Sequence, residues 1–149
     1  MQVVYHGSYK RIEYPKIIEG QFTKDFGIGF YCTIIKEQAK KWSLKYKKGV
    51  VNIYEYHENK NLKIKEFTLM TEEWLDFIIE SRNGKKHHFD IVIGPMADDQ
   101  IYNYITDLMN GIITREAFWE LAKFKYPTHQ ITFCTKEALK CLKFIDCEE

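Results

Sequence analysis

The sequence lacks the long apolar run that a membrane-spanning helix requires. No stretch of its 149 residues approaches the roughly 18–20 consecutive apolar residues needed to cross a bilayer. The N-terminal residues 1–6 have neither a basic segment nor a small-residue cleavage site, so no signal peptide is expected. These absences predict a cytoplasmic protein.

Proline and cysteine are also scarce. The chain has 3 prolines and 4 cysteines, and the cysteines at 32, 134, 141 and 147 form neither a CxxC pair nor a zinc-like spacing. The adjacent His87 and His88 diverge on either a helix or a strand, which disfavours shared metal ligation. We therefore expect free thiols and no bound metal.

A large excess of one charge is absent as well. The chain has 22 basic and 21 acidic side chains, so whole-chain electrostatics predict no particular partner. Locally, residues 36–48 carry six lysines against one acid, Glu37. Such a stripe could meet phosphates. A solvated helix face is the favoured interpretation.

Apolar material is plentiful, since 45% of the residues are hydrophobic and 15% are aromatic. That is enough for a substantial core, at a length typical of one compact domain. We therefore expect a single domain over residues 1–149. The composition excludes a disordered tail, a collagen-like repeat and a disulfide-stabilised miniprotein.

Hydrophobic periodicity predicts a mixture of strands and helices. Strands are expected at 3–6, 29–33, 50–56, 89–93, 130–134 and 142–145. Helices are expected over 35–47 and 101–109, and after threonine caps at Thr71 (to about 82), Thr114 (to about 124) and Thr135 (one or two turns). The order is not a regular βαβ alternation, so it predicts an α+β fold with a partly antiparallel sheet.

Two short motifs are excluded by their context. Asp25-Phe26-Gly27 matches the magnesium-binding tripeptide of protein kinases, but the chain is too short for a kinase and lacks the other kinase motifs. Gly27-Ile28-Gly29 lacks the third glycine and the following helix of a dinucleotide fingerprint, and no P-loop sequence is present.

Two other segments combine groups that suit a flat ligand. Tyr5-His6-Gly7-Ser8 places an imidazole at a strand end, beside a glycine that lets a ligand approach the backbone. Residues 27–33 lead through two glycines into a strand that carries Tyr31, and Trp42 follows eleven residues later. One aromatic ring on a strand and another on the next helix can form the two walls of a slot for a heteroaromatic ring.

These segments resemble the ADP-ribosyltransferase superfamily, in the branch of diphtheria toxin and the poly(ADP-ribose) polymerases. That branch has a strand-end His-Gly-Ser/Thr, then a Gly-x-Gly-[Phe/Ile]-Tyr strand, then a second aromatic residue eleven positions on, here Trp42 in place of the usual tyrosine. With residues 89–95 and 97–99 included, nearly the whole chain also resembles a bacterial family of small single-domain members (DUF3990-like), often encoded beside a small antitoxin-like protein. The resemblance implies a split mixed β-sheet core with flanking helices.

The resemblance also implies roles for particular residues. His6 would hydrogen-bond a ribose hydroxyl of NAD, and the backbone at Gly7 would pair with the nicotinamide amide. Tyr31 and Trp42 would enclose the nicotinamide ring. Gln130 falls where the superfamily usually has a glutamate that bonds the ribose 2′-OH. The expected catalytic residues are His6, Tyr31 and Gln130, and the expected NAD-binding residues are His6, Gly7, Ser8, Tyr31 and Trp42.

Gln130 departs from the superfamily pattern, because an amide carries no negative charge and cannot act as a base. An acid elsewhere could take its part, and the sequence offers Asp98, Asp99, Glu116 and Glu137. If Gln130 holds this position, residues 124–128 just before it would form the target-recognition loop.

The function implied by the resemblance is NAD-dependent transfer of ADP-ribose to a macromolecular acceptor, protein or nucleic acid, with release of nicotinamide. The chain would then be the toxin of a bacterial toxin–antitoxin pair. Two alternatives stay open: an NAD glycohydrolase of the same fold, in which water is the acceptor, and a non-catalytic module that binds NAD or ADP-ribose.

Overall fold

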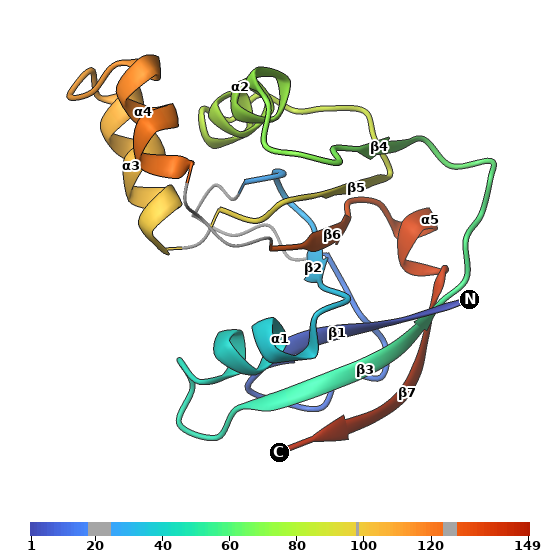
Figure 1. Cartoon of the computed structure of the whole chain (residues 1–149). Helices are drawn as coiled ribbons and strands as arrows, with labels where there is room; N and C mark the ends of the chain where they lie inside the picture. Colours follow the sequence, from blue (N-terminus) through green and yellow to red (C-terminus); the bar gives the residue numbers. More distant parts are fainter. Residues whose placement is uncertain (18–24, 98, 124–127) are drawn as a thin grey trace.

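The computed structural model describes residues 1–17, 25–97, 99–123 and 128–149. It shows an α+β fold with two sheets and flanking helices, which confirms the fold class expected from the sequence (Figure 1). Within the described ranges, every helix is too short or too polar to span a bilayer.

One sheet is antiparallel throughout. β1 (Gln2–Ser8) and β7 (Leu142–Glu148) both pair with the central strand β3 (Val50–Tyr56). The side chain of Asn52 in β3 is fully buried, and it hydrogen-bonds the backbone of Lys10 and Ile12. The chain that leaves β1 is therefore held against β3.

The other sheet is mixed, with the strand order β2-β6-β5-β4. β2 (Phe30–Cys32), β6 (Gln130–Phe133) and β5 (Ile91–Gly94) are antiparallel neighbours, whereas β4 (Ile64–Glu66) pairs parallel with β5. β4 was not among the predicted strands. Its three residues include a lysine and a glutamate and show no strand pattern of their own, so only the pairing with β5 makes them a strand.

A pair of backbone hydrogen bonds joins the two sheets. The amide of Tyr5 in β1 donates to the carbonyl of Thr33 at 2.8 Å, and the amide of Thr33 donates to the carbonyl of Tyr5 at 2.9 Å. This is an isolated bridge, because β1 pairs with β3 along its length while β2 pairs with β6. The two strands therefore separate beyond it.

The helices begin and end largely where the capping residues predict. α2 (Glu72–Arg82), α4 (Arg115–Ala122) and α5 (Lys136–Leu139) follow the three expected caps, and each threonine accepts a hydrogen bond from the amide three residues on. α3 (Asp99–Met109) ends just before Gly111, whose φ of 73° suits only glycine.

The first helix is shorter than expected. α1 (Lys36–Ser43) ends four residues before the predicted end at 47. The chain folds back on the helix end, since a Cβ on Gly49 would lie 2.2 Å from the carbonyl oxygen of Ser43. Gly49 thus allows a close return that stops the helix earlier than the apolar spacing indicates.

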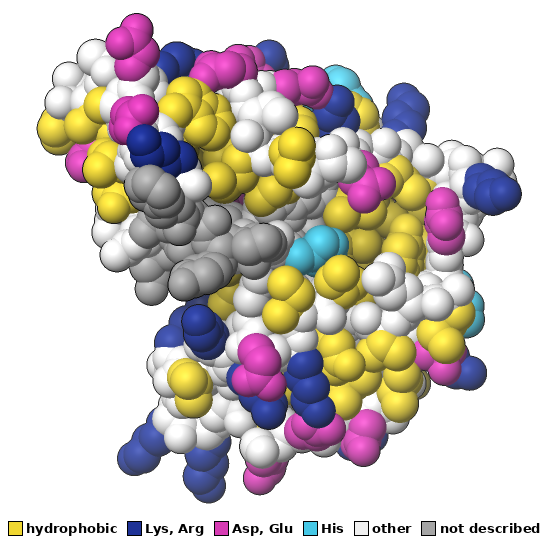
Figure 2. Space-filling model, in the orientation of Figure 1, with side chains coloured by type: hydrophobic (Ala, Val, Ile, Leu, Met, Phe, Trp, Pro, Cys, Tyr) yellow, Lys and Arg dark blue, Asp and Glu magenta, His cyan; other side chains and the backbone are white. Residues whose placement is uncertain are grey.

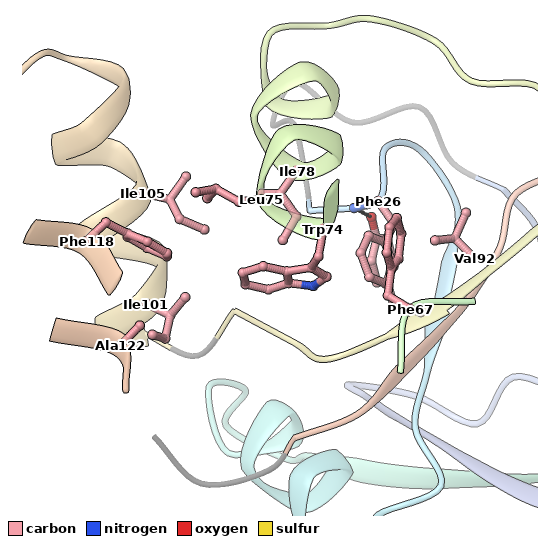
Figure 3. Packing of buried hydrophobic residues seen from close by; sticks show 11 residues of the cluster. Phe26, Phe67, Trp74, Leu75, Ile78, Val92, Ile101, Ile105, Phe118 and Ala122 are labelled. Carbon is pink, nitrogen blue, oxygen red and sulfur yellow. Dashed lines mark hydrogen bonds between the residues drawn. The ribbon is translucent and has the colours of Figure 1, made fainter. Parts of the chain in front are cut away.

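The larger apolar cluster lies between the mixed sheet and helices α2, α3 and α4 (Figure 3). Figure 3 shows the ring of Trp74 between α2 and the other two helices. The side chains that meet here are at most 1% exposed: Trp74, Leu75, Ile78, Ile101, Ile105 and Phe118. The indole of Trp74 also donates to the carbonyl of Pro95 at 2.9 Å, so the cluster anchors the segment after β5.

Helix α1 lies directly against β1 at Gly7 (Figure 1). A Cβ on Gly7 would lie 2.2 Å from the carbonyl oxygen of Ala39 and 2.9 Å from the amide of Ser43. Glycine is therefore needed at position 7 because α1 approaches the strand so closely. The sequence analysis had instead attributed this glycine to the approach of a ligand.

We predict that Gly7→Ala lowers the free energy of unfolding by about 1–3 kcal/mol, because the added methyl group meets backbone atoms that cannot rotate away. Urea denaturation followed by circular dichroism measures the change. Lys41→Ala, on the exposed side of α1, is the control and should leave the stability nearly unchanged. Wild-type stability in Gly7→Ala would contradict the close contact.

Candidate functional site

The structure brings most of the predicted site residues to one cavity of about 340 Å³. His6, Gly7, Tyr31, Trp42 and Gln130 line it, although they come from three separate parts of the chain. The remaining described lining residues are Asp25, Lys45, Tyr46, Met96, Ala97 and Tyr102.

Ser8 lies elsewhere. It lines a neighbouring cavity of about 510 Å³, together with the segment that follows β1. His6 and Tyr31 line both cavities, so the two adjoin at these residues. The first cavity contains the group of residues expected to hold a flat ring, and the second adjoins it.

His6 is fixed in orientation by two contacts. Its Nδ1 lies 2.5 Å from the carbonyl oxygen of Tyr31, so Nδ1 carries a proton and donates it to that bond. Its ring stacks on Phe30, with centroids 4.0 Å apart and an angle of 24°. In the neutral imidazole this tautomer leaves the lone pair on Nε2 and makes that atom a hydrogen-bond acceptor.

Tyr31 combines a place in the core with a place in the cavity wall. The residue is 8% exposed, and its hydroxyl donates to the carbonyl of Gly27 at 2.5 Å and accepts from the amide of Phe26 at 3.1 Å. Gly27 has a φ of 83°, a left-handed conformation that suits glycine. Burial, reinforced by the charge of Asp25, raises the pKa of Tyr31 well above its ordinary value, so the phenol stays neutral.

Gln130 begins β6 and is 3% exposed. Within the described part of the chain, its side-chain Nε2 is buried and has no hydrogen-bond partner. A buried amide without a partner costs about 1–3 kcal/mol. Gln130 lines the cavity, and its buried amide nitrogen is not engaged by the other described residues.

A second glutamine positions the start of β6. The amide group of Gln38 in α1 donates to the carbonyl of His129 at 2.7 Å and accepts from its amide at 3.0 Å. This pairing mimics a backbone ladder and holds the residue just before Gln130. The sequence analysis missed Gln38, because its partner lies 91 residues away and no local pattern connects them.

A carboxylate lines the cavity at a position that the sequence analysis did not propose. Asp25 pairs with Arg82 at 2.7 Å, and the two side chains are 9% and 4% exposed. Asp25 also accepts from the amide of Ala97 at 3.0 Å, and the guanidinium of Arg82 lies 3.8 Å from the ring centroid of Tyr102. The pair therefore holds the wall of the cavity together and neutralises the carboxylate.

Of the four alternative acids, the two whose side chains are described, Glu116 and Glu137, do not line this cavity. Glu116 and Glu137 are exposed, and Glu137 pairs with Lys140 at 3.1 Å. Asp98 lies outside the described residues, and Asp99 begins α3 with a side chain that is not described. The expected target-recognition loop also falls outside the described ranges, apart from Thr128, whose hydroxyl bonds the backbone of Met96.

We predict that Arg82→Met lowers the free energy of unfolding by about 3–5 kcal/mol, because it leaves Asp25 buried without its cation. The double variant Asp25→Asn/Arg82→Met should recover part of that loss. Arg115→Met is the matched control, since this exposed arginine pairs with Glu72 and Asp76 on the surface, and it should cost about 0–1 kcal/mol. Equal losses at the two arginines in chemical denaturation would contradict the burial of the first pair.

A pH dependence is expected from His129. Burial lowers its pKa below the ordinary value of 6.5, and its Nδ1 accepts from the amide of Ile34 at 3.3 Å. The folded state thus favours the neutral ring, so this stabilisation is present above about pH 6.5 and is lost as the pH falls through the folded pKa.

Unfolding free energies of His129→Asn should therefore decline less between pH 7.5 and 5.5 than those of the wild type. The exposed His88 provides the control variant, His88→Asn, which should follow the wild-type decline. A parallel decline in His129→Asn and the wild type would show that His129 protonates equally in both states.

Comparison with known proteins identifies one family. Over residues 2–144 the chain matches the model described as "Protein of unknown function (DUF3990)". The resemblance to DUF3990-like proteins is thereby confirmed. No curated protein and no solved structure shows significant similarity to the chain.

Proposed function

The chain belongs to the DUF3990 family, and we propose that it is an NAD-dependent ADP-ribosyltransferase that releases nicotinamide and modifies a macromolecular target. One observation carries the proposal. Five residues for which the resemblance implies a role, His6, Gly7, Tyr31, Trp42 and Gln130, line a single cavity. Separate motifs that serve only packing would not be expected to converge in this way.

The fold is compatible with this function. The β1 and β2 strands belong to two different sheets that touch at the Tyr5–Thr33 bridge, and the cavity lies beside that bridge. This arrangement supports the split mixed sheet of the ADP-ribosyltransferase superfamily as the finer description of the fold.

The residues present suit NAD in size and in chemistry. Two adjoining cavities of about 340 and 510 Å³ that share His6 and Tyr31 fit a ligand with two ring-bearing halves. Lys16 lines the second cavity and can balance part of the charge of a pyrophosphate. The buried, unpaired Nε2 of Gln130 offers a donor for a ribose hydroxyl.

The chemistry that NAD supplies is the nicotinamide–ribose bond, whose electron pair returns to the ring nitrogen when the bond breaks. His6 can accept a hydrogen bond from a ribose hydroxyl through Nε2, and Trp42 and Tyr31 can contact the nicotinamide ring. Gln130 can position the ribose but adds no negative charge. We therefore expect slow turnover, since positioning is retained and charge stabilisation is weak.

The resemblance alone also suggests a biological context for this activity. Small members of this kind are often encoded beside an antitoxin-like protein, so we propose that the chain is the toxin of such a pair. The neutralising protein would act by blocking the cavity or its target.

A non-catalytic module that binds NAD or ADP-ribose is the second candidate, and a specific contact favours it. Asp25, the acid among the described lining residues, is neutralised by Arg82, so it cannot take over the role of the missing glutamate without losing its partner. An NAD glycohydrolase, with water as the acceptor, would use the same residues as the transferase.

We predict that the purified protein releases nicotinamide from NAD, and that Gln130→Ala reduces the rate by about 100-fold, because it removes an amide from the wall of the proposed NAD site. Gln130→Glu should raise the rate, since a carboxylate supports a cationic sugar better than an amide. Free nicotinamide is measured by chromatography, with and without cell lysate. Gln100→Ala, an exposed glutamine on α3, is the matched control.

The three functions give different results. Label transferred from NAD to macromolecules supports the transferase, and release that is equal without lysate supports the glycohydrolase. Quenching of tryptophan fluorescence by NAD that is lost in Trp42→Phe, without any release, supports the binding module. Equal rates for wild type, Gln130→Ala and Gln130→Glu would rule Gln130 out as a site residue.

A further inference from the structure

Two tyrosines that contact each other line the two cavities, one in each. Tyr9 lines the larger cavity and Tyr46 the smaller one, and their ring centroids are 5.5 Å apart at an angle of 54°. Tyr9 is 59% exposed, which is high for a large aromatic side chain. The pair therefore presents an open aromatic face between the two cavities.

The backbone beside this face is held firmly. Asn52 bonds the backbone of Lys10 and Ile12, and the hydroxyl of Tyr54 donates to the carbonyl of Ile12 at 2.6 Å. Tyr9 is thus attached to a fixed segment. The exposed ring of Tyr9 therefore stands on an ordered backbone, which suits stacking against a partner ring.

Positive charge surrounds the tyrosine pair. The ammonium group of Lys10 lies 5.5 Å from the ring centroid of Tyr9, and that of Lys45 lies 5.3 Å from the ring centroid of Tyr46. The lysines of α1 and the following turn continue the basic surface, and Figure 2 shows Lys and Arg side chains gathered around α1 at the lower left of the molecule. Acids also lie nearby: Glu13 pairs with Arg11, Glu37 with Lys40 and Glu148 with Lys36, and Glu149 lines a further cavity beside Tyr46.

We propose that this surface binds single-stranded nucleic acid, with a base stacked on Tyr9 and phosphates beside Lys10 and Lys45. Alternating aromatic faces and cations are what a single strand requires, since each nucleotide offers a flat ring and one negative charge. An acidic protein segment would pair with the lysines but would leave the tyrosine faces without a matching group.

The tyrosine surface lies beside the proposed NAD site, so we infer that the bound strand is the acceptor of ADP-ribose. This step rests on the proposed function. A strand held at Tyr9 and Tyr46 brings its bases to the mouth of the cavity in which the nicotinamide–ribose bond is exposed. A nitrogen of a base would then form the new bond to the ribose C1″ as nicotinamide leaves with the electron pair of the broken bond. The proton displaced from that nitrogen passes to solvent.

The test is binding of a fluorescein-labelled oligothymidine of twelve nucleotides, followed by fluorescence anisotropy without NAD. We expect binding that weakens steeply between about 50 and 200 mM salt. Tyr9→Ala should weaken it by about tenfold, whereas Tyr9→Phe, which keeps the ring, should bind as the wild type does. Lys45→Ala should weaken binding and reduce its salt dependence, and Lys140→Ala, on α5 and paired with Glu137, is the control.

The results separate this proposal from its alternatives. No binding at low salt, or binding of inorganic polyphosphate that matches the oligonucleotide and is unchanged in Tyr9→Ala, would overturn it. Tyr9-dependent binding in a protein that does not cleave NAD would support the nucleic-acid surface while the proposed function fails. Nicotinamide release with transfer of label to lysate proteins, and none to the oligonucleotide, would overturn the acceptor role alone.

Discussion

The hydrogen bonds between Tyr5 and Thr33 are the constraint on which the site depends, because they join two sheets that otherwise follow separate partners. A continuous ladder between β1 and β2 would leave no room between them. The next residue along β1, His6, uses its imidazole to bond the carbonyl of Tyr31. Where the strands separate, the side chain of His6 thus connects β1 to β2 in place of a backbone hydrogen bond. The cavity lies beside this histidine.

The apolar side chains that stabilise the fold and the buried polar side chains beside the cavity lie in different parts of the molecule. The cluster around Trp74, between the mixed sheet and α2, α3 and α4, is apolar and contributes by burial (Figure 3). The polar groups beside the cavity contribute less and cost more, since Asp25 and Arg82 form a buried ion pair and Gln130 has an unpaired amide.

Local signals in the sequence predicted local structure well. The caps at Thr71, Thr114 and Thr135 and the strand at 50–56 appear where the residues indicate, because each depends on contacts within a few positions. β4 was missed because it is a strand only beside β5. Of the site, the motif residues were predictable, whereas the pairing of Asp25 with Arg82, 57 residues apart, depends on the folded chain alone.

A neutral residue at position 130 has a consequence for the choice between transfer and hydrolysis. Because Asp25, the carboxylate among the described lining residues, is paired with Arg82, the proposed reaction would gain little from negative charge, so an untethered water molecule would react slowly. In the proposed reaction, an acceptor held at Tyr9 and Tyr46 would gain instead from proximity, which can supply several kcal/mol of the barrier. The neutral amide at position 130 would then lower the overall rate but favour a bound acceptor over water, and so favour transfer over hydrolysis of NAD.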